Sequence, residues 1–166
     1  MNMSNITIDG QEMDLSQTMP SYAQVVSLYD DTSISVSNNE TDKVLAGSLY
    51  TDTNEQGLTI PSSLLKNWNE QTGKNLTAND LIGKSVSASI VESAAETSKI
   101  AQFQTKIVRV INDEDDMEDS NSFMLPHQME TISKEAGFTK AVSYFILELK
   151  DPSQTKVVTE ELQKNK

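Results

Sequence analysis

The chain has 166 residues, and its 25 acidic and 13 basic side chains give a formal net charge of −12. A surface of that charge repels phosphate backbones and anionic lipid headgroups, so nucleic acid is not expected as a partner. The length suits one core, or one core with a small lobe, and the absence of cysteine excludes disulfides, thiolate metal sites and thiol nucleophiles.

The N-terminal part of the chain is interpreted as an irregular or short-strand lead-in to the rest of the lobe. Its first twenty residues show no sustained hydrophobic period and end in a proline, so they are expected to be irregular or weakly paired. Two short strands are predicted after them, Tyr22–Tyr29 and Ser33–Ser37, on either side of a turn at Asp30–Asp31. The next segment, Lys43–Tyr50, fits a strand and a short helix equally well.

Two segments, Leu58–Gly73 and Met124–Gly137, carry the same series of signals: an apolar stretch, a proline, a helical pattern and a closing glycine. Proline fixes φ near the helical value and lacks an N–H that a first-turn residue would leave unpaired, so it favours a helix start. Glycine suits the left-handed residue that ends a helix. Each segment is predicted to be a strand that feeds a helix, and the inward side chains are expected to be Leu64, Leu65 and Trp68 in the first and Met129, Ile132 and Ala136 in the second.

Further strands are predicted after both units. Lys84–Ser93 and Lys99–Ile111 are predicted to form a hairpin around a turn at Ala94–Thr97, because apolar and polar residues alternate in the first of them. Another strand is predicted at Ala141–Lys150, and a last helix after Asp151, which suits the cap position before a proline. Together these elements predict an α+β fold in which a mixed β-sheet contains β-α-β units and the helices pack on one face.

The segment Ala78–Ser85, with the sequence ANDLIGKS, matches a relaxed phosphate-loop pattern. A phosphate loop follows a buried strand and opens a helix, so that backbone N–H groups converge on the anion. Here polar residues precede the segment and an alternating strand follows it. We therefore interpret it as one buried helical turn that Thr77 and Asp80 cap, and we expect no nucleotide or other cofactor.

An acidic run, Asn112–Asn121, raises the question of a calcium site, because hard cations bind clustered carboxylates. Met117 falls where an alternating ligand series needs oxygen, and no glycine in the run provides the sharp turn of a calcium loop. No metal site is assigned, and the run is interpreted as an exposed acidic loop. The alternative is a weak cation site or a contact with a basic partner, for which the candidate residues are Asp113, Glu114, Asp115, Asp116, Glu118 and Asp119.

His127 is the only histidine, so any acid–base step near neutral pH that uses an imidazole depends on it. It follows Pro126 in a first helical turn, where an exposed structural residue is the ordinary outcome, and no nucleophile elbow lies nearby in the sequence. No catalytic residue is assigned, and the chain is not expected to be an enzyme. A small hydrolase built around His127 is a third interpretation, which requires His127→Ala to abolish a measured turnover.

Four stretches carry a family resemblance, namely NEQGLTIPSSLLKNW (Asn54–Trp68), DLIGKSV (Asp80–Val86), FQTKIVRVI (Phe103–Ile111) and FMLP (Phe123–Pro126). In this order and spacing they resemble the extracytoplasmic domain of ABC transporter permeases of the macrolide-exporter type, the MacB-like members of the FtsX-like class. The resemblance covers residues 43–166, whereas residues 1–42 form the lead-in segment of the same lobe. Arg109 stands where the family's strand often has glycine.

The resemblance implies a non-catalytic part of a transporter at the extracellular face of the cell membrane, and by analogy a Gram-positive cell is favoured. In such permeases a separate ATPase subunit or domain hydrolyses ATP, and the permease passes the motion of its membrane helices to the external domain. The implied partners are that ATPase, reached through membrane helices outside these residues, and an adaptor protein of the membrane-fusion type. The full permease is expected to be a homodimer and the isolated domain a monomer, in the export of peptides, antibiotics or lipids.

A second class of function is a free-standing cell-surface module that captures a peptide or a carbohydrate. The natural gene discriminates between the two classes. Apolar stretches of about 20 residues on both sides of this segment would support the permease. A signal peptide and a wall-anchoring tail would support the module.

Overall fold

The structure, a computed structural model, describes residues 2–15, 25–27, 43–52, 54–93, 98–113 and 121–138, together with 153, 155–156 and 159. Its strands are β1 (Asn2–Ile8), β2 (Gln11–Met13), β3 (Val25–Ser27), β4 (Val44–Gly47), β5 (Leu58–Pro61), β6 (Ser85–Ser93), β7 (Ser98–Ile111) and β8 (Ser122–Met124). Its helices are α2 (Ser62–Thr72), α3 (Ala78–Leu81) and α4 (Pro126–Glu135).

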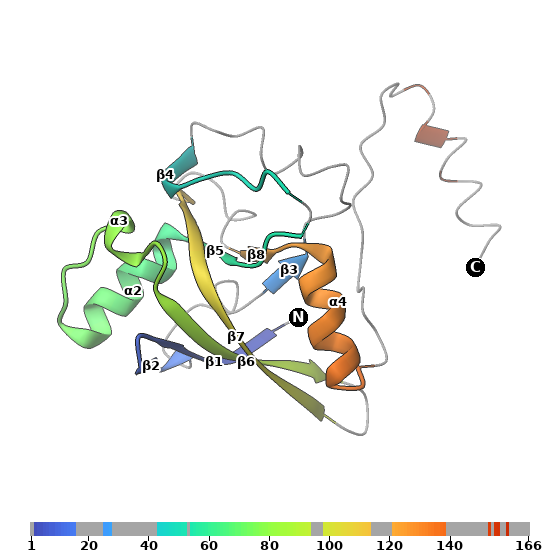
Figure 1. The fold of residues 1–166 in the computed structure, drawn as a ribbon, viewed down its shortest axis with the longest axis horizontal. Helices are drawn as coiled ribbons and strands as arrows, with labels where there is room; N and C mark the ends of the chain where they lie inside the picture. The colour runs from blue at the N-terminus through green and yellow to red at the C-terminus, as the bar shows by residue number, and fades with distance from the viewer. Residues whose placement is uncertain are drawn as a thin grey trace.

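These eight strands form one sheet in the order β2-β1-β6-β7-β5-β8-β3, and β4 pairs with β7 beside this path (Figure 1). The sheet is mixed, because β5 runs parallel to β7 and β3 runs parallel to β8, whereas the other pairs are antiparallel. The predicted α+β class is therefore confirmed. β7 pairs with β6 along its first part and with β5 and β4 along its last part, so it joins the two halves of the sheet.

The N-terminus forms a β-hairpin, so the prediction of an irregular or weakly paired start was wrong. Asp9 and Gly10 both have positive φ values, 49° and 77°, as in the two-residue turns that best match the twist of paired strands. β1 also pairs antiparallel with β6, and its side chains Ile6 and Ile8 are fully buried. A bulge just after Met3 breaks the alternation of buried residues. The strand therefore has no regular hydrophobic period in the sequence.

The long hairpin predicted from the alternating segments is confirmed. β6 pairs with β7 along its whole length, and Val86, Ala88 and Ile90 of β6 are buried as the alternation predicts. The turn predicted at Ala94–Thr97 lies outside the described residues.

Both proline-led units are confirmed as strands that feed helices. Pro126 is the first residue of α4, as predicted, whereas Pro61 stands one position earlier, at the N-cap of α2, with an extended backbone (φ −75°, ψ 152°). Gly73 and Gly137 follow the two helices with φ values of 66° and 65°. After α4, the N–H groups of two successive residues donate back to carbonyls of its last turn, so these carbonyls are satisfied.

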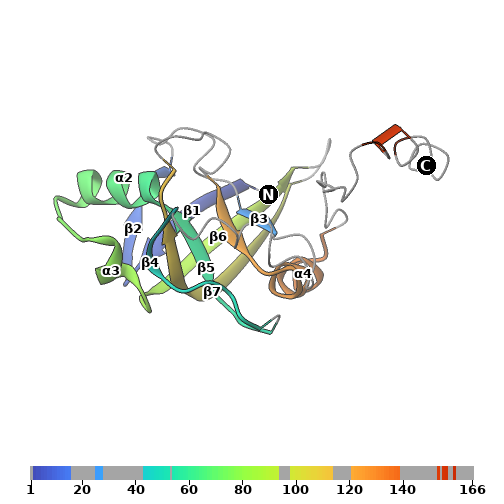
Figure 2. The ribbon, with the colours of Figure 1, turned by 90° about the horizontal axis from the view of Figure 1, so that it is seen from above.

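The helices α2 and α4 lie toward opposite ends of the sheet, and side chains from both enter one hydrophobic core (Figures 1 and 2). α2 lies in the connection between β5 and β7, which are parallel neighbours, so a helix occupies this crossover as predicted. Of the side chains predicted to face inward, Ala136 is half-buried, and the buried ones are Leu64, Leu65, Trp68, Met129 and Ile132.

Two glycines allow neighbouring segments to approach β7 closely at Val108. A Cβ atom on Gly47 of β4 would lie 2.1 Å from the carbonyl oxygen of Val108, and one on Gly57, just before β5, would lie 2.3 Å from Val108 Cγ1. Gly47 also has a φ of 88°, in the left-handed region. A side chain at Gly47 would displace the backbone of β7, and one at Gly57 would displace the side chain of Val108.

The remaining predicted elements are decided only in part. Lys43–Tyr50, which fitted a strand and a short helix, contains the strand β4. Of the strand predicted at Tyr22–Tyr29 the structure describes β3 alone, which pairs with β8. The strands predicted at Ser33–Ser37 and Ala141–Lys150, the turn before the first of them and the start of the last helix at Asp151 lie outside the described residues.

Candidate functional site

Asp113 is the one residue of the partner-binding candidates that the structure describes, and it lies at the N-terminus of α2. Its Oδ1 accepts hydrogen bonds from Ser62 Oγ (2.7 Å) and the N–H of Ser63 (2.9 Å), and its Oδ2 accepts one from Ser63 Oγ. We call these three residues the N-terminal clamp. Asp113 is buried, in contrast to the exposed loop expected for the whole run. The other candidates lie outside the described residues: Glu114, Asp115, Asp116, Glu118 and Asp119.

The N-terminal clamp gives α2 a cap that its own sequence lacks. α2 has neither a side-chain cap at its first position nor an acidic residue in its first turn. The first N–H groups of a helix have no partner within the helix, and the helix dipole places partial positive charge there. Asp113 supplies an acceptor and a negative charge from 50 residues further along the chain than Ser63. Sequence reasoning missed this contact because capping motifs join residues within a single turn.

Asp113→Asn is expected to lower the free energy of unfolding by about 1–2 kcal/mol, because the amide removes the charge and replaces one acceptor oxygen by a donor. Urea unfolding followed by far-UV circular dichroism measures the change. Glu70→Gln, at an exposed position of the same helix, is the matched control and is expected to stay within about 0.5 kcal/mol of the parent chain. Equal losses in the two variants would show that the N-terminal clamp does not stabilise α2.

A second clamp joins the C-terminal part of α2 to the N-terminal hairpin. Gln71 Oε1 accepts a hydrogen bond from the N–H of Asp14, and Gln71 Nε2 donates to the carbonyl oxygen of Asp14, both at 2.9 Å. Asp14 directly follows β2. The pair of Gln71 and Asp14, which we call the C-terminal clamp, therefore joins the end of the hairpin to the last turn of α2 through two solvent-exposed hydrogen bonds.

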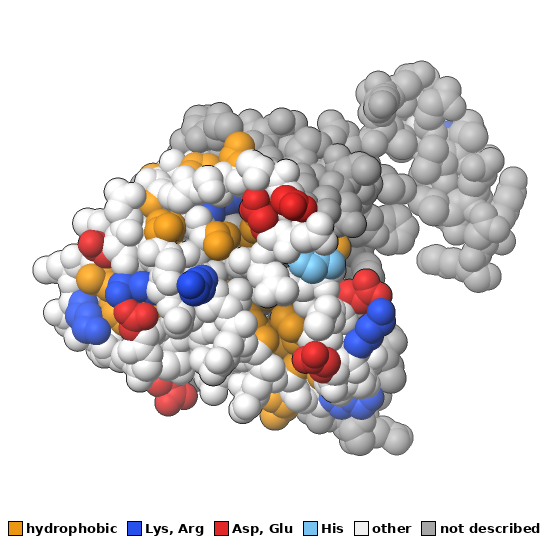
Figure 3. All heavy atoms as spheres, in the orientation of Figure 1, with side chains coloured by type: hydrophobic (Ala, Val, Ile, Leu, Met, Phe, Trp, Pro, Cys, Tyr) orange, Lys and Arg blue, Asp and Glu red, His pale blue; other side chains and the backbone are white. Residues whose placement is uncertain are grey.

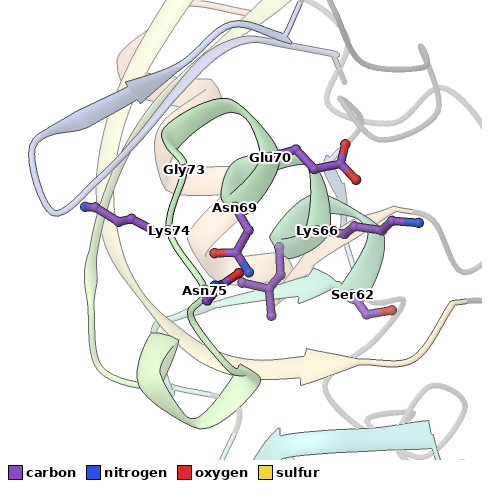
Figure 4. Close-up of a pocket in the computed structure, with 8 residues that line it drawn as sticks. Ser62, Lys66, Asn69, Glu70, Gly73, Lys74 and Asn75 are labelled. Atoms are coloured by element: carbon purple, nitrogen blue, oxygen red, sulfur yellow. The ribbon is translucent and has the colours of Figure 1, made fainter.

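A groove of about 520 Å³ lies between α2 and the segment that follows it (Figure 4). The Asn69 amide accepts from the N–H of Leu76 at 3.0 Å and donates to its carbonyl oxygen at 2.8 Å. Lys66 and Lys74 point away from each other on the two sides of the groove (Figure 4). Lys74 Nζ lies 4.8 Å from the centre of the Trp68 ring. The groove thus presents two cations, but its central amide is already bonded within the fold.

A second hollow, of about 300 Å³, lies over the outward face of β1, β6 and β7. Hydroxyl and amide side chains form two rows across the three strands, Thr7–Ser87–Gln104 and Asn5–Ser89–Gln102. These side chains carry no charge, although the chain as a whole has a formal charge of −12. A surface of this kind offers donors and acceptors to a neutral polar ligand.

A buried polar network lies where β7 meets β5. Arg109 Nε donates to Thr59 Oγ1 at 3.1 Å, and the Tyr50 hydroxyl lies 3.2 Å from the same oxygen. The guanidinium carbon lies 5.1 Å from the centre of the Tyr50 ring. Burial raises the pKa of the Tyr50 phenol and lowers the pKa of Arg109.

The structure confirms the interpretation of Ala78–Ser85 as a capped helical turn. The Asp80 carboxylate accepts from the hydroxyl and the N–H of Thr77 at 2.7 and 2.8 Å, and these bonds hold the pKa of Asp80 below its usual range. The N–H of Gly83 donates to the carbonyl oxygen of Ile107 in β7, and Lys84 forms a salt bridge with Asp9. Because the segment leads into β6 and these groups are already bonded, it does not have the geometry of a phosphate loop.

His127 lies in the first turn of α4, on the face shown in Figure 3. It is half-buried, whereas the sequence predicted an exposed residue. Neither ring nitrogen has a hydrogen-bond partner among the described residues. The adjacent Gln128 is tied into the fold, because its Oε1 accepts from the N–H of Gly57 at 3.0 Å and its Nε2 donates to Thr105 Oγ1 at 3.1 Å. Within the described ranges, no three side chains of His, Asp or Glu gather as a metal site.

No protein-family model matches the chain, and no curated protein sequence matches it. Among the helices that the structure describes, none has both the length and the apolar character needed to cross a bilayer.

Proposed function

We propose that this chain is the non-catalytic extracellular domain of a MacB-like ABC transporter permease. The observation that carries the proposal is the place of the four resembling stretches in the fold. They form β5 with most of α2, the turn into β6, the last part of β7, and β8 with the start of α4. Because β7, β5 and β8 are successive strands of the sheet, three of the stretches lie side by side although they are far apart in the sequence.

In this role the domain receives motion from membrane helices outside these residues and passes it to cargo or to an adaptor protein. ATP is hydrolysed by a separate ATPase, and the full permease is a homodimer. The acidic run that begins at Asp113 is the proposed contact for a basic surface of the adaptor, since complementary charge speeds association and selects partners.

The proposal is tested by capture of an adaptor. The immobilised domain is expected to retain the membrane-fusion-type protein encoded next to the natural gene. Changing Glu114, Asp115, Asp116, Glu118 and Asp119 together to lysine is expected to weaken capture about tenfold at low salt, because favourable charge pairs become repulsive. Surface plasmon resonance at two salt concentrations measures the effect.

The matched control reverses two exposed charges of α4, Glu130→Lys with Glu135→Lys, and is expected to leave capture unchanged. Retention of the adaptor by the reversed acidic run would remove that run from the interface while leaving the permease assignment in place. Absence of capture, together with a natural gene that encodes no membrane-spanning segment on either side, would overturn the assignment.

The second candidate, a cell-surface binding module, is favoured by the hollow over β1, β6 and β7, whose lining side chains carry no charge. Its hydroxyl and amide groups suit a carbohydrate better than a charged peptide. Calorimetric titration with neutral wall glycans tests it. Heat that disappears in the double variant Gln102→Ala with Gln104→Ala would favour the module over the permease.

A further inference from the structure

We propose that α2 mechanically couples the chain that leaves β2 to the chain that leaves β7. The N-terminal clamp holds Asp113, two residues after the end of β7, against the first turn of the helix. The C-terminal clamp holds Asp14, the residue after β2, against its last turn. The two clamps therefore join one helix to two segments that have no pairing with each other in the sheet order.

Coupling follows from the size of the helix. α2 has 11 residues, and helices of this length are marginal without outside contacts, so their ends fray. From Ser63 to Gln71 the helix rises by about 12 Å. If one clamp opens, the helix frays from that end, and the side chain at the other end is held less firmly. Leu64 and Trp68 pack the middle of the helix into the core and oppose fraying. The strength of this packing therefore limits how strongly one clamp affects the other.

The coupling through α2 does not depend on the permease assignment. It concerns how a force or a contact on the acidic run, which begins at Asp113, reaches the N-terminal hairpin. A partner that displaces the run acts on α2 through the carboxylate of Asp113. The first loss of hydrogen bonding is then expected at the peptide group of Asp14, at the other end of the helix.

Hydrogen exchange tests the coupling, because each clamp contains a backbone N–H that reports on it. The N–H of Ser63 donates to Asp113, and the N–H of Asp14 donates to Gln71. Asp113→Asn is expected to speed exchange of the Asp14 N–H about threefold or more, and Gln71→Met to do the same for the Ser63 N–H. Amide exchange in the centre of the β6–β7 pair measures global unfolding, and the rates are corrected for it.

Glu70→Gln, on the same helix but outside both clamps, is expected to change neither rate. Ser62→Ala removes the hydroxyl that donates to Asp113 Oδ1 and accepts from the N–H of Asp113, but it leaves both bonds from Ser63 in place. It is therefore expected to give a smaller acceleration at Asp14 than Asp113→Asn. It also serves as the test if Asp113→Asn unfolds. If each substitution speeds exchange only at its own clamp after the correction, α2 does not couple the two segments and the proposal is wrong.

Discussion

Gly47→Ala is expected to lower the free energy of unfolding by about 2–5 kcal/mol, because it adds both a steric clash and a backbone strain. The new Cβ would lie 2.1 Å from the carbonyl oxygen of Val108, a backbone atom that cannot move without disturbing β7. The φ of 88° at Gly47 also lies in the region where an L side chain costs about 1–2 kcal/mol. Urea unfolding followed by far-UV circular dichroism measures the loss.

Gly10→Ala is the control that separates these two costs. Gly10 has a similar φ of 77°, but no atom lies within 4 Å of a Cβ placed there. This variant is therefore expected to lose only the backbone contribution, about 1–2 kcal/mol. If both variants lose the same free energy, the approach of β4 to Val108 is looser in solution than the structure indicates.

Trp68→Ala is expected to lower the free energy of unfolding by about 3–5 kcal/mol, because it removes a large buried side chain and leaves a cavity. Trp68 is 1% exposed and packs in the core that α2 shares with the sheet. It is the only tryptophan, so unfolding of the variant must be followed by far-UV circular dichroism and not by indole fluorescence.

Two further variants make this test decisive. Trp68→Phe keeps an aromatic ring in the same space and is expected to lose clearly less than Trp68→Ala, so it reports on the site if the alanine variant does not fold. Leu45→Ala removes an apolar side chain that is 48% exposed and is expected to lose about 0.5 kcal/mol or less. A loss for Trp68→Ala as small as that for Leu45→Ala would place Trp68 outside the core.

The elements that sequence reasoning predicted correctly are those with strong local signals. The two proline-led helices combine a helical period with a proline at the start and a glycine at the end, and the β6–β7 hairpin has a clear strand alternation. Local chemistry decides such elements. The N-terminal hairpin was missed although Asp9–Gly10 is a strong hairpin signal, because the bulge after Met3 disturbs the period on one side of the turn.

The contacts of the candidate site were harder to predict from the sequence than the elements of the fold. The acidic run can be recognised from its composition. The hydrogen bonds of Asp113 to the first turn of α2 cannot, because the pairing of β5 with β7 is what brings these residues together. The same holds for the amide of Gln71, which bonds the peptide group of Asp14 from 57 residues away. Long-range contacts of this kind depend on tertiary structure, and no local pattern encodes them.

The N-terminal hairpin also decides where this lobe can be cut. A fragment that began at Lys43, where the proposed resemblance to permease domains begins, would lack β1 and β2. The backbone N–H and C=O groups of β6 that bond β1 would then form an open edge, beside core side chains such as Val86 and Ile90 that had lost their cover. Open strand edges recruit strands from other molecules, so such a fragment would aggregate, and the first thirteen residues have to be kept in any soluble form of the lobe.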